Sequence, residues 1–258
     1  MYFDESGRCT TKLTSHEVYH KSRSYFQIDE TLKQKIDLKQ IYNNLHHSYS
    51  ANITTTYEIF LDKINNLKNK INKDEKLKNI NNGISIPFII PKLIKTDIGN
   101  NIQEIFIPSL EKSYKKIYPD YEFKNHCSED LLNKITYFSE SKYGNFLKKS
   151  EKEEIVGLYF PCMNEFSFPA ALETIKKMPF ELNLSGGYEI LSSLIGMPNL
   201  LFRKEKYPPL LWFSSLRNVE NDKIGYHIEP YGYNLTFNRR AHLDQAAEYW
   251  WHSITICL

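Results

Sequence analysis

Apolar residues recur every three or four positions in the first third of the chain, which is the spacing of one helix face. The clearest example lies within residues 53–79, where the pattern predicts a long amphipathic helix. An earlier stretch that begins at Asp29 predicts a shorter helix, because Asp29 can cap its start. The join between them, Ser48–Asn52, is short enough for an antiparallel helical hairpin. The apolar stripe of the long helix consists of Tyr57, Phe60, Leu61, Ile64, Leu67 and Ile71.

After Gly83 the pattern changes to short apolar runs. Ile84–Ile90 predicts a buried strand, and Pro87 within it indicates an edge position or a bulge. Ile102–Ile107 fits either a strand or a helix, whereas Leu110–Ile117 predicts a helix. Ser128 is a suitable cap for a further helix over 129–138. Residues 140–154 are charged and weakly patterned, so we expect a linker or a surface excursion there.

The C-terminal half has the clearest start and stop signals. Ile155–Phe160 predicts a strand, and Ser167 and Ser185 each precede a predicted helix. Gly186 and Gly187 match neither a phosphate-binding loop nor a dinucleotide fingerprint, so we interpret them as a helix start. Four aromatic-rich segments then predict strands: 209–215, 223–229, 233–238 and 250–257.

These elements predict one α+β domain. Residues 1–28 form an irregular N-terminal segment, 29–80 the helical hairpin, and 84–258 an α+β core. We expect the hairpin to pack on a mostly antiparallel sheet formed largely by the C-terminal half. A length of 258 residues is compatible with a single domain.

The C-terminal segments carry a family resemblance. Leu211–Ser214, Gly225–Ile228 and Ile254–Cys257, with Ile86–Pro91 as a central apolar strand, resemble the pattern of an uncharacterised bacterial domain-of-unknown-function family. The resemblance covers the last ~100 residues. It implies an intracellular α+β domain and no particular activity.

Charge and cysteine usage narrow the expected partners and location. The chain has 33 basic and 31 acidic residues, which gives no reason to expect nucleic acid or a membrane surface as partner. The N-terminus lacks the pattern of a signal peptide, and no apolar run approaches the ~20 residues that span a bilayer. Four separated cysteines indicate reduced thiols in the cytoplasm, although a protein exported without a signal peptide has the same features. We expect no cofactor.

One segment matches a metalloprotease motif. His16, Glu17 and His20 form H-E-x-x-H, which on a helix places two histidines on one face for zinc. Here Lys21 follows at once and the apolar periodicity is weak, so we interpret the histidines as surface residues and expect no metal site.

A second cluster could support acid–base chemistry. His227 and Glu229 alternate onto one face of a predicted strand, and His252 lies on the last strand. If these strands pair, the three side chains would converge as the catalytic group of a hydrolase, with or without the assistance of a metal. The alternative is a set of polar residues on the wet face of an antiparallel sheet. Cys162 is a further candidate nucleophile, which we interpret as a buried structural thiol.

Aromatic residues are concentrated in the last quarter. Ten of them lie between Tyr207 and Trp251, with arginines among them, a composition typical of interface anchors. Trp250 and Trp251 must point to opposite faces of a strand, so one needs cover from another layer, a partner or a ligand. The alternative is an aromatic core. We therefore expect a protein- or ligand-binding module first and a hydrolase second. The predicted binding residues are Trp212, Tyr231, Tyr233, Arg239, Arg240, Trp250 and Trp251.

Overall fold

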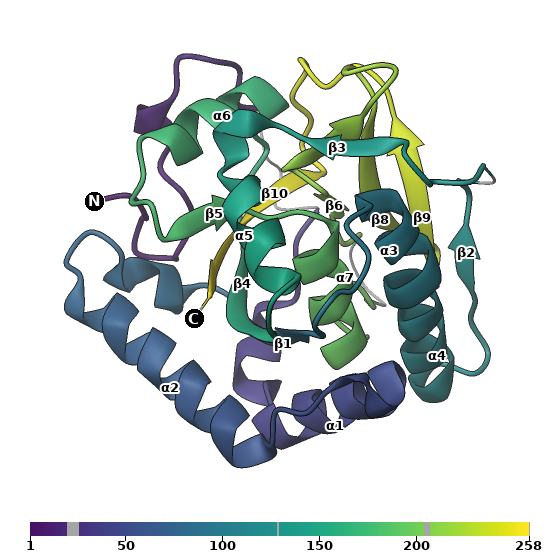
Figure 1. Cartoon of the computed structure of the whole chain (residues 1–258). Coiled ribbons are helices and arrows are strands. Elements are labelled where there is room, and N and C mark those ends of the chain that lie inside the picture. The colour runs from purple at the N-terminus through teal and green to yellow at the C-terminus, as the bar shows by residue number, and fades with distance from the viewer. Residues whose placement is uncertain (20–25, 128, 204–206, 258) are drawn as a thin grey trace.

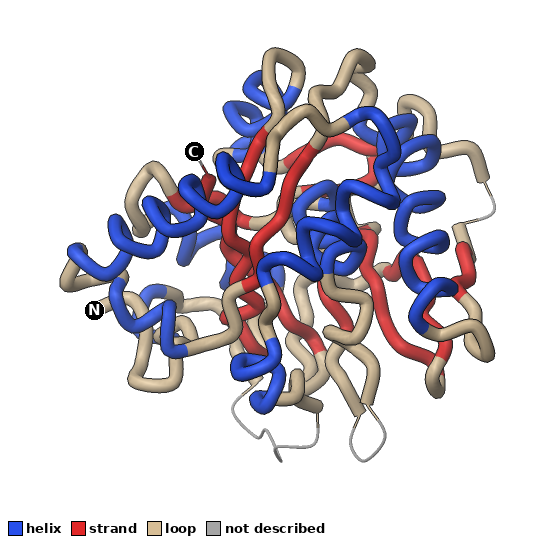
Figure 2. The backbone as a smooth tube through the Cα atoms, turned by 90° about the horizontal axis from the view of Figure 1, so that it is seen from below, coloured by secondary structure: helices blue, strands red, loops and turns tan. Residues whose placement is uncertain are grey.

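A mixed sheet runs through the middle of the molecule, with helices around it (Figures 1 and 2). The computed structural model describes residues 1–19, 26–127, 129–203 and 207–257. Neighbouring strands are antiparallel except for two parallel pairs, β10 with β6 and β9 with β2. The α+β class and the mostly antiparallel sheet are therefore confirmed. The order across the sheet is β1 (Ile86–Ile90), β4 (Ile155–Asn164), β10 (Trp250–Cys257), β6 (Leu210–Trp212), β8 (Gly225–Tyr231), β9 (Asn234–Arg240) and β2 (Phe123–Asn125), with β5 (Leu182–Leu184) also beside β10.

The sheet is built on the apolar runs seen in the sequence. β4 and β10 lie next to each other and are buried along almost their whole length. Among the described strands β1 pairs only with β4, so Pro87 lies on an edge strand, as predicted. A separate two-stranded sheet joins β3 (Ile135–Tyr137) to β7 (Leu216–Asn218), which the sequence did not predict.

The helices pack their apolar faces against the sheet and against one another. The fully buried α7 (Gly187–Gly196) packs against β1, α1 (Leu38–Tyr49) and α4 (Ile107–Ile117), while α2 (Tyr57–Lys73) packs on β4. Ser167 caps α6 as predicted, with its Oγ accepting from the Ala170 amide. The α-helices are α1 (Leu38–Tyr49), α2 (Tyr57–Lys73), α3 (Ile98–Asn101), α4 (Ile107–Ile117), α5 (Tyr143–Ser150), α6 (Phe168–Lys176) and α7; 3₁₀ turns cover Thr11–Leu13, Glu30–Lys35, Ser50–Asn52, Lys78–Asn82 and Ser139–Ser141.

The two predicted N-terminal helices form, but their tight antiparallel pairing is wrong. The Tyr42 hydroxyl, near the start of α1, donates to the Thr55 carbonyl at 3.1 Å. The Tyr42 ring also lies 5.4 Å from Tyr57 and 5.8 Å from Phe60, in the first turn of α2. The connecting segment thus returns to the start of α1 before α2 begins. Each helix buries its stripe against a different part of the core, α1 against α7 and β1 and α2 against β4.

Two further segments differ from the prediction. The helix expected over 129–138 is wrong: Asn133 has a left-handed φ of 59°, which interrupts a helix, and β3 follows. Ser128, its expected cap, lies outside the described residues. Residues 140–154 are no linker, because α5 buries Tyr143 and Phe146 there. Ile102–Phe106 is π-helical and joins α3 to α4. In the described part of the chain no helix is long and apolar enough to cross a membrane.

Candidate functional site

The predicted catalytic residues lie on the face of the sheet opposite to the main core. On β8, Tyr226 and Ile228 belong to the main core, so Gly225, His227 and Glu229 face the other side. β8 pairs His227 with Asn238 of β9 and with Trp212 of β6. This arrangement places His227 and Glu229 on one face, as the alternation predicted.

His227 and Glu229 form a pair of a neutral imidazole and a carboxylate. His227 Nε2 lies 3.3 Å from Glu229 Oε1, which also accepts from Asn238 Nδ2 at 3.0 Å. Burial lowers the pKa of His227. Burial raises the pKa of Glu229, but the nearby His227 ring, the charge of Arg240 and the hydrogen bond from Asn238 together outweigh it and lower that pKa overall. Neither ring nitrogen of His227 has a well-aligned hydrogen bond to another described residue.

His252 does not join this pair, so the predicted three-residue catalytic group is wrong. β10 runs parallel to β6, with Trp251 opposite Leu211, which puts His252 beside Trp212. β6, which carries Trp212, therefore lies between the strands of the two histidines, and these two strands are about 10 Å apart. His252 Nε2 lies 2.9 Å from the Phe166 carbonyl and Nδ1 2.9 Å from Ser214 Oγ. Burial lowers the pKa of His252 to about 3, so the ring is a neutral structural group.

All three tryptophans are core residues rather than surface anchors, which overturns that part of the predicted binding set. Trp212, Trp250 and Trp251 are exposed by 0%, 4% and 7% respectively. Trp250 and Trp251 do belong to different clusters, as adjacent strand residues must. Trp250 packs on Trp212 with ring centroids 4.9 Å apart. Both faces are covered by the chain itself, so neither tryptophan requires a partner.

The two arginines point to opposite faces of β9 and are engaged within the chain. Arg239 pairs with Glu129. Arg240 Nη1 donates to the Tyr249 hydroxyl at 2.6 Å, and its Nη2 lies 3.7 Å from Glu229 Oε2. Both side chains remain partly exposed, but their charges already have partners.

The two predicted tyrosines are exposed at the β8–β9 turn. Tyr231 is 79% exposed and Tyr233 38%. Gly232 between them has a left-handed φ of 62°, and a Cβ atom at this position would meet no described atom within 4 Å, so the turn projects from the sheet. Tyr233 packs against Tyr121 and Phe202, at 5.1 and 5.4 Å between ring centroids.

These rings belong to a larger surface cluster that the sequence pattern did not reveal. Tyr118 stacks on Phe202 with centroids 4.0 Å apart and planes at 7°. Three segments far apart in the sequence supply the rings, so no local pattern could have indicated the cluster. We call it the tyrosine patch; it consists of Tyr118, Tyr121, Phe202 and Tyr233, with the exposed Tyr231 in the same turn as Tyr233.

A small groove of about 120 Å³ begins beside the tyrosine patch. It lies between α1, the end of α4 and the end of α7, and shares Tyr118 with the patch. Ile117 and Met197 supply apolar surface, and Lys35 and Asp37 lie at its edge. The patch and the groove together give an aromatic surface next to a hollow.

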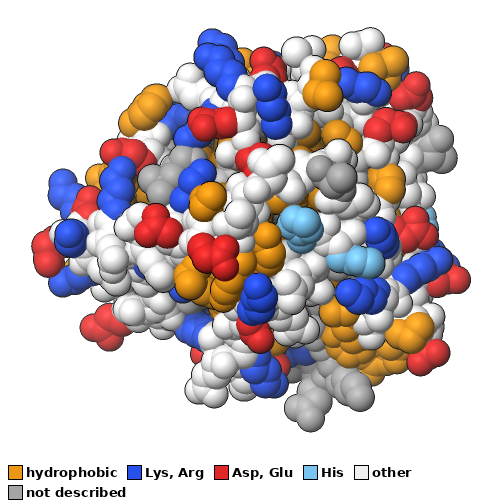
Figure 3. All heavy atoms as spheres, turned by 60° about the horizontal axis from the view of Figure 1, so that its bottom comes forward, with side chains coloured by type: hydrophobic (Ala, Val, Ile, Leu, Met, Phe, Trp, Pro, Cys, Tyr) orange, Lys and Arg blue, Asp and Glu red, His pale blue; other side chains and the backbone are white. Residues whose placement is uncertain are grey.

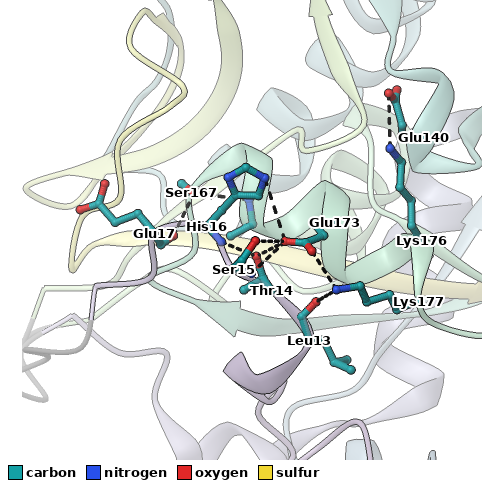
Figure 4. Close-up of polar contacts among 11 residues, drawn as sticks. Leu13, Thr14, Ser15, His16, Glu17, Glu140, Ser167, Glu173, Lys176 and Lys177 are labelled. Atoms are coloured by element: carbon teal, nitrogen blue, oxygen red, sulfur yellow. Dashed lines mark hydrogen bonds and ion pairs between the residues drawn. The ribbon is translucent and has the colours of Figure 1, made fainter.

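The described part of the H-E-x-x-H match, residues 16–19, is not helical. His20 is outside the described residues, and the part that contains His16 is a bend. Figure 4 shows His16 next to Glu173 of α6, with Nε2 4.0 Å from Oε2. Across the described ranges no group of three or more His, Cys, Asp or Glu side chains could hold a metal.

The same view shows how the N-terminal segment is held (Figure 4). Glu173 Oε2 accepts from Thr14 Oγ1 at 2.8 Å and from the Ser15 amide at 2.9 Å, while Oε1 accepts from Lys177 at 2.7 Å. Ser167 Oγ donates to the Glu17 carbonyl at 2.9 Å. The Lys177 hydrogen bond, with those of Ser15 and Thr14, lowers the pKa of Glu173 to about 2. His16 is therefore a neighbour of a structural clamp.

Charges of both signs are interspersed over the face formed by α1 and α2 (Figure 3).

No family model, curated protein or solved structure matches the chain. The resemblance of the C-terminal segments to an uncharacterised bacterial family therefore stays a prediction.

Proposed function

We propose that this protein is a binding module that recognises another protein through the tyrosine patch. The observation that supports this most is the exposure of Tyr231, at 79%, in the same turn as Tyr233, whose ring packs on the stacked aromatic cluster. Tyrosines are enriched among the residues that dominate binding energy, because they bury a large area and lose little conformational entropy. A patch whose rings already support one another avoids part of the ordering cost of binding.

The groove beside the patch favours a partner with a carboxylate. Lys35 lines this groove and has no ion pair to a described residue, whereas Asp37, which also lines it, is engaged as the cap of α1. A carboxylate on the partner would complement Lys35 and steer its approach.

A hydrolase is the second candidate, and the geometry supports it less. His227 beside Glu229 is a minimal acid–base pair. However, His227 is 1% exposed, and the third expected residue, His252, is held by Phe166 and Ser214.

The proposal also places the protein in a bacterial cytoplasm, which the four free cysteines and the family resemblance support.

Photo-crosslinking in cells of the source organism tests the proposal. Tyr231 is replaced by p-benzoyl-phenylalanine, and Ile59, an exposed apolar residue on α2, is replaced in a matched control. We expect a discrete protein adduct from position 231 and none from position 59. Excess wild-type protein should suppress the adduct, whereas the Tyr231→Ala, Tyr233→Ala variant should not. Equal adducts from both positions, or suppression by both competitors, would contradict the proposal.

A further inference from the structure

A second surface feature is a groove beside α6, on the face of the sheet that carries His227. Its volume is about 320 Å³, which is within the range of small-molecule sites. Its walls are apolar, formed by Phe138, Phe168, Leu172 and Leu243. Its rim carries two acidic and two basic residues: Asp222, Asp244, Lys223 and His242. Charges of both signs at the rim favour a ligand without net charge.

The side chains at the floor of this groove also cover the buried cluster that contains Trp212 and Trp250. A Cβ on Gly225 would approach Leu243, Phe168 and Trp212 to 3.0–3.1 Å, so these three side chains converge above that glycine. Phe168 and Leu243 belong both to the groove lining and to the cluster of Trp212 and Trp250. These two side chains therefore lie between the groove and the tryptophans.

Polar atoms without partners lie directly behind this cover. The indole Nε1 atoms of Trp212 and Trp250 are buried and make no hydrogen bond to any described residue. The same is true of Nδ1 of His227, whose ring lies 4.8 Å from Trp212. Buried polar atoms are normally paired, because leaving one unpaired costs free energy. Here three unpaired nitrogen atoms lie on rings that contact one another, which indicates that a polar group of a ligand can bind between them.

The cover is attached in a way that permits movement. Leu243 lies in the β9–β10 connection, between exposed residues on both sides. Its carbonyl accepts from the Phe168 amide at 3.2 Å. His242 before it has a left-handed φ of 67°, a conformation that side-chain-bearing residues rarely adopt. A small rotation at this residue would lift Leu243 without disturbing a strand.

We propose that this groove binds a small, uncharged aromatic compound that carries a hydroxyl group. The ring would lie against Phe168 and Leu172, and the hydroxyl would replace Leu243 above the tryptophans. A hydroxyl both accepts and donates, so it can accept from an indole N–H and donate to a neutral imidazole nitrogen. A charged group is disfavoured, because it would lose its hydration in this apolar site.

Nuclear magnetic resonance of the tryptophan side chains tests this with phenol as the probe. The protein has three tryptophans, so three indole N–H signals are assigned with single Trp→Phe variants. We expect phenol to shift the Trp212 and Trp250 signals saturably and to leave the Trp251 signal in place. Toluene, which lacks the hydroxyl, should bind at least tenfold more weakly.

Leu172→Trp supplies the matched variant, because it fills the groove from a half-buried position on α6 and spares the tryptophan cluster. Phenol should no longer shift either signal in this variant, whose thermal unfolding confirms that it is folded. Tyr231→Ala, on the other surface, should bind phenol as the wild type does. Absence of saturable shifts, equal binding of toluene, or unchanged binding by Leu172→Trp would overturn the proposal and leave water as the partner of the buried nitrogens.

Discussion

The rings of Tyr118 and Phe202 stack nearly parallel, with centroids 4.0 Å apart. Tyr118 follows α4, and Phe202 lies in the loop after α7, so the stack ties two separate segments together. Tyr233 then packs against Phe202 from the β8–β9 turn. The tyrosine patch is therefore supported from below by fixed rings, while Tyr231 remains exposed.

This arrangement predicts that a ring that supports the patch contributes to the free energy of unfolding, whereas the exposed ring of Tyr231 does not. Phe202→Ala should lower the free energy of unfolding by about 2 kcal/mol, because a half-buried ring and its aromatic contacts are lost. Tyr231→Ala should change it by less than about 0.5 kcal/mol, because the side chain is exposed. Urea denaturation of both variants measures the difference. A similar destabilisation by the two substitutions would show that Tyr231 is structural.

Glu189 gives a pH dependence of stability. Burial raises its pKa from 4.5 to about 7, although the Tyr143 hydroxyl donates to its Oε2 at 2.8 Å. A raised pKa in the folded state means that the stabilisation is complete below the ordinary pKa and is lost as pH rises through about 7. Glu189→Gln should remove this loss and be more stable than the wild type at pH 8. Parallel pH profiles of the free energy of unfolding for the two proteins would contradict the assignment.

Two buried serines on neighbouring elements should respond differently to the same substitution. Ser214 Oγ lies 2.9 Å from His252 Nδ1, so Ser214→Ala leaves a buried imidazole nitrogen unpartnered and should cost about 1–3 kcal/mol. Ser253 Oγ has no well-aligned hydrogen bond to a described residue and lies near the Tyr159 hydroxyl, so Ser253→Ala should cost less than Ser214→Ala. Urea denaturation compares them. A larger loss for Ser253→Ala would mean that its hydroxyl has an essential partner.

The clamp at Glu173 should control access to the N-terminal segment. Its pKa is lowered from 4.5 to about 2, so the clamp holds above the ordinary pKa and is lost only as pH falls through about 2. Glu173→Gln should speed amide hydrogen exchange at Thr14–Glu17, because a charge-assisted acceptor is removed. Glu181→Gln, a carboxylate in an exposed ion pair with Lys70, is the control and should leave exchange there unchanged. Unaltered exchange in both variants would show that contacts other than those of Glu173 hold the segment.

Local features of the fold could be predicted from the sequence, because they depend on neighbouring residues. The α2 stripe, the Ser167 cap and the edge position of β1 all follow from spacing or from the geometry of single residues. The left-handed Asn133 could not be predicted from a helix-compatible stretch, and it removed one expected helix.

The features of the candidate sites that could not be predicted depend on contacts between residues far apart in the sequence. The alternation of β8 was sufficient to bring His227 and Glu229 together. Whether His252 joined them depended on the order of the strands, and β6 lies between β8 and β10. The tyrosine patch likewise depends on contacts of Tyr118 with Phe202, which no periodicity encodes. The exposed Tyr231 was identifiable only as part of an aromatic composition.

The most direct test of the central claim is the affinity of the partner captured through position 231, measured by titration calorimetry. Wild type, Tyr231→Ala and Ile59→Ala are compared, since both substitutions remove an exposed apolar side chain. Binding through the tyrosine patch predicts at least about tenfold weaker affinity for Tyr231→Ala alone, the effect of a loss near 1.4 kcal/mol. Equal affinities of all three proteins would contradict the claim and place the binding surface elsewhere on the molecule.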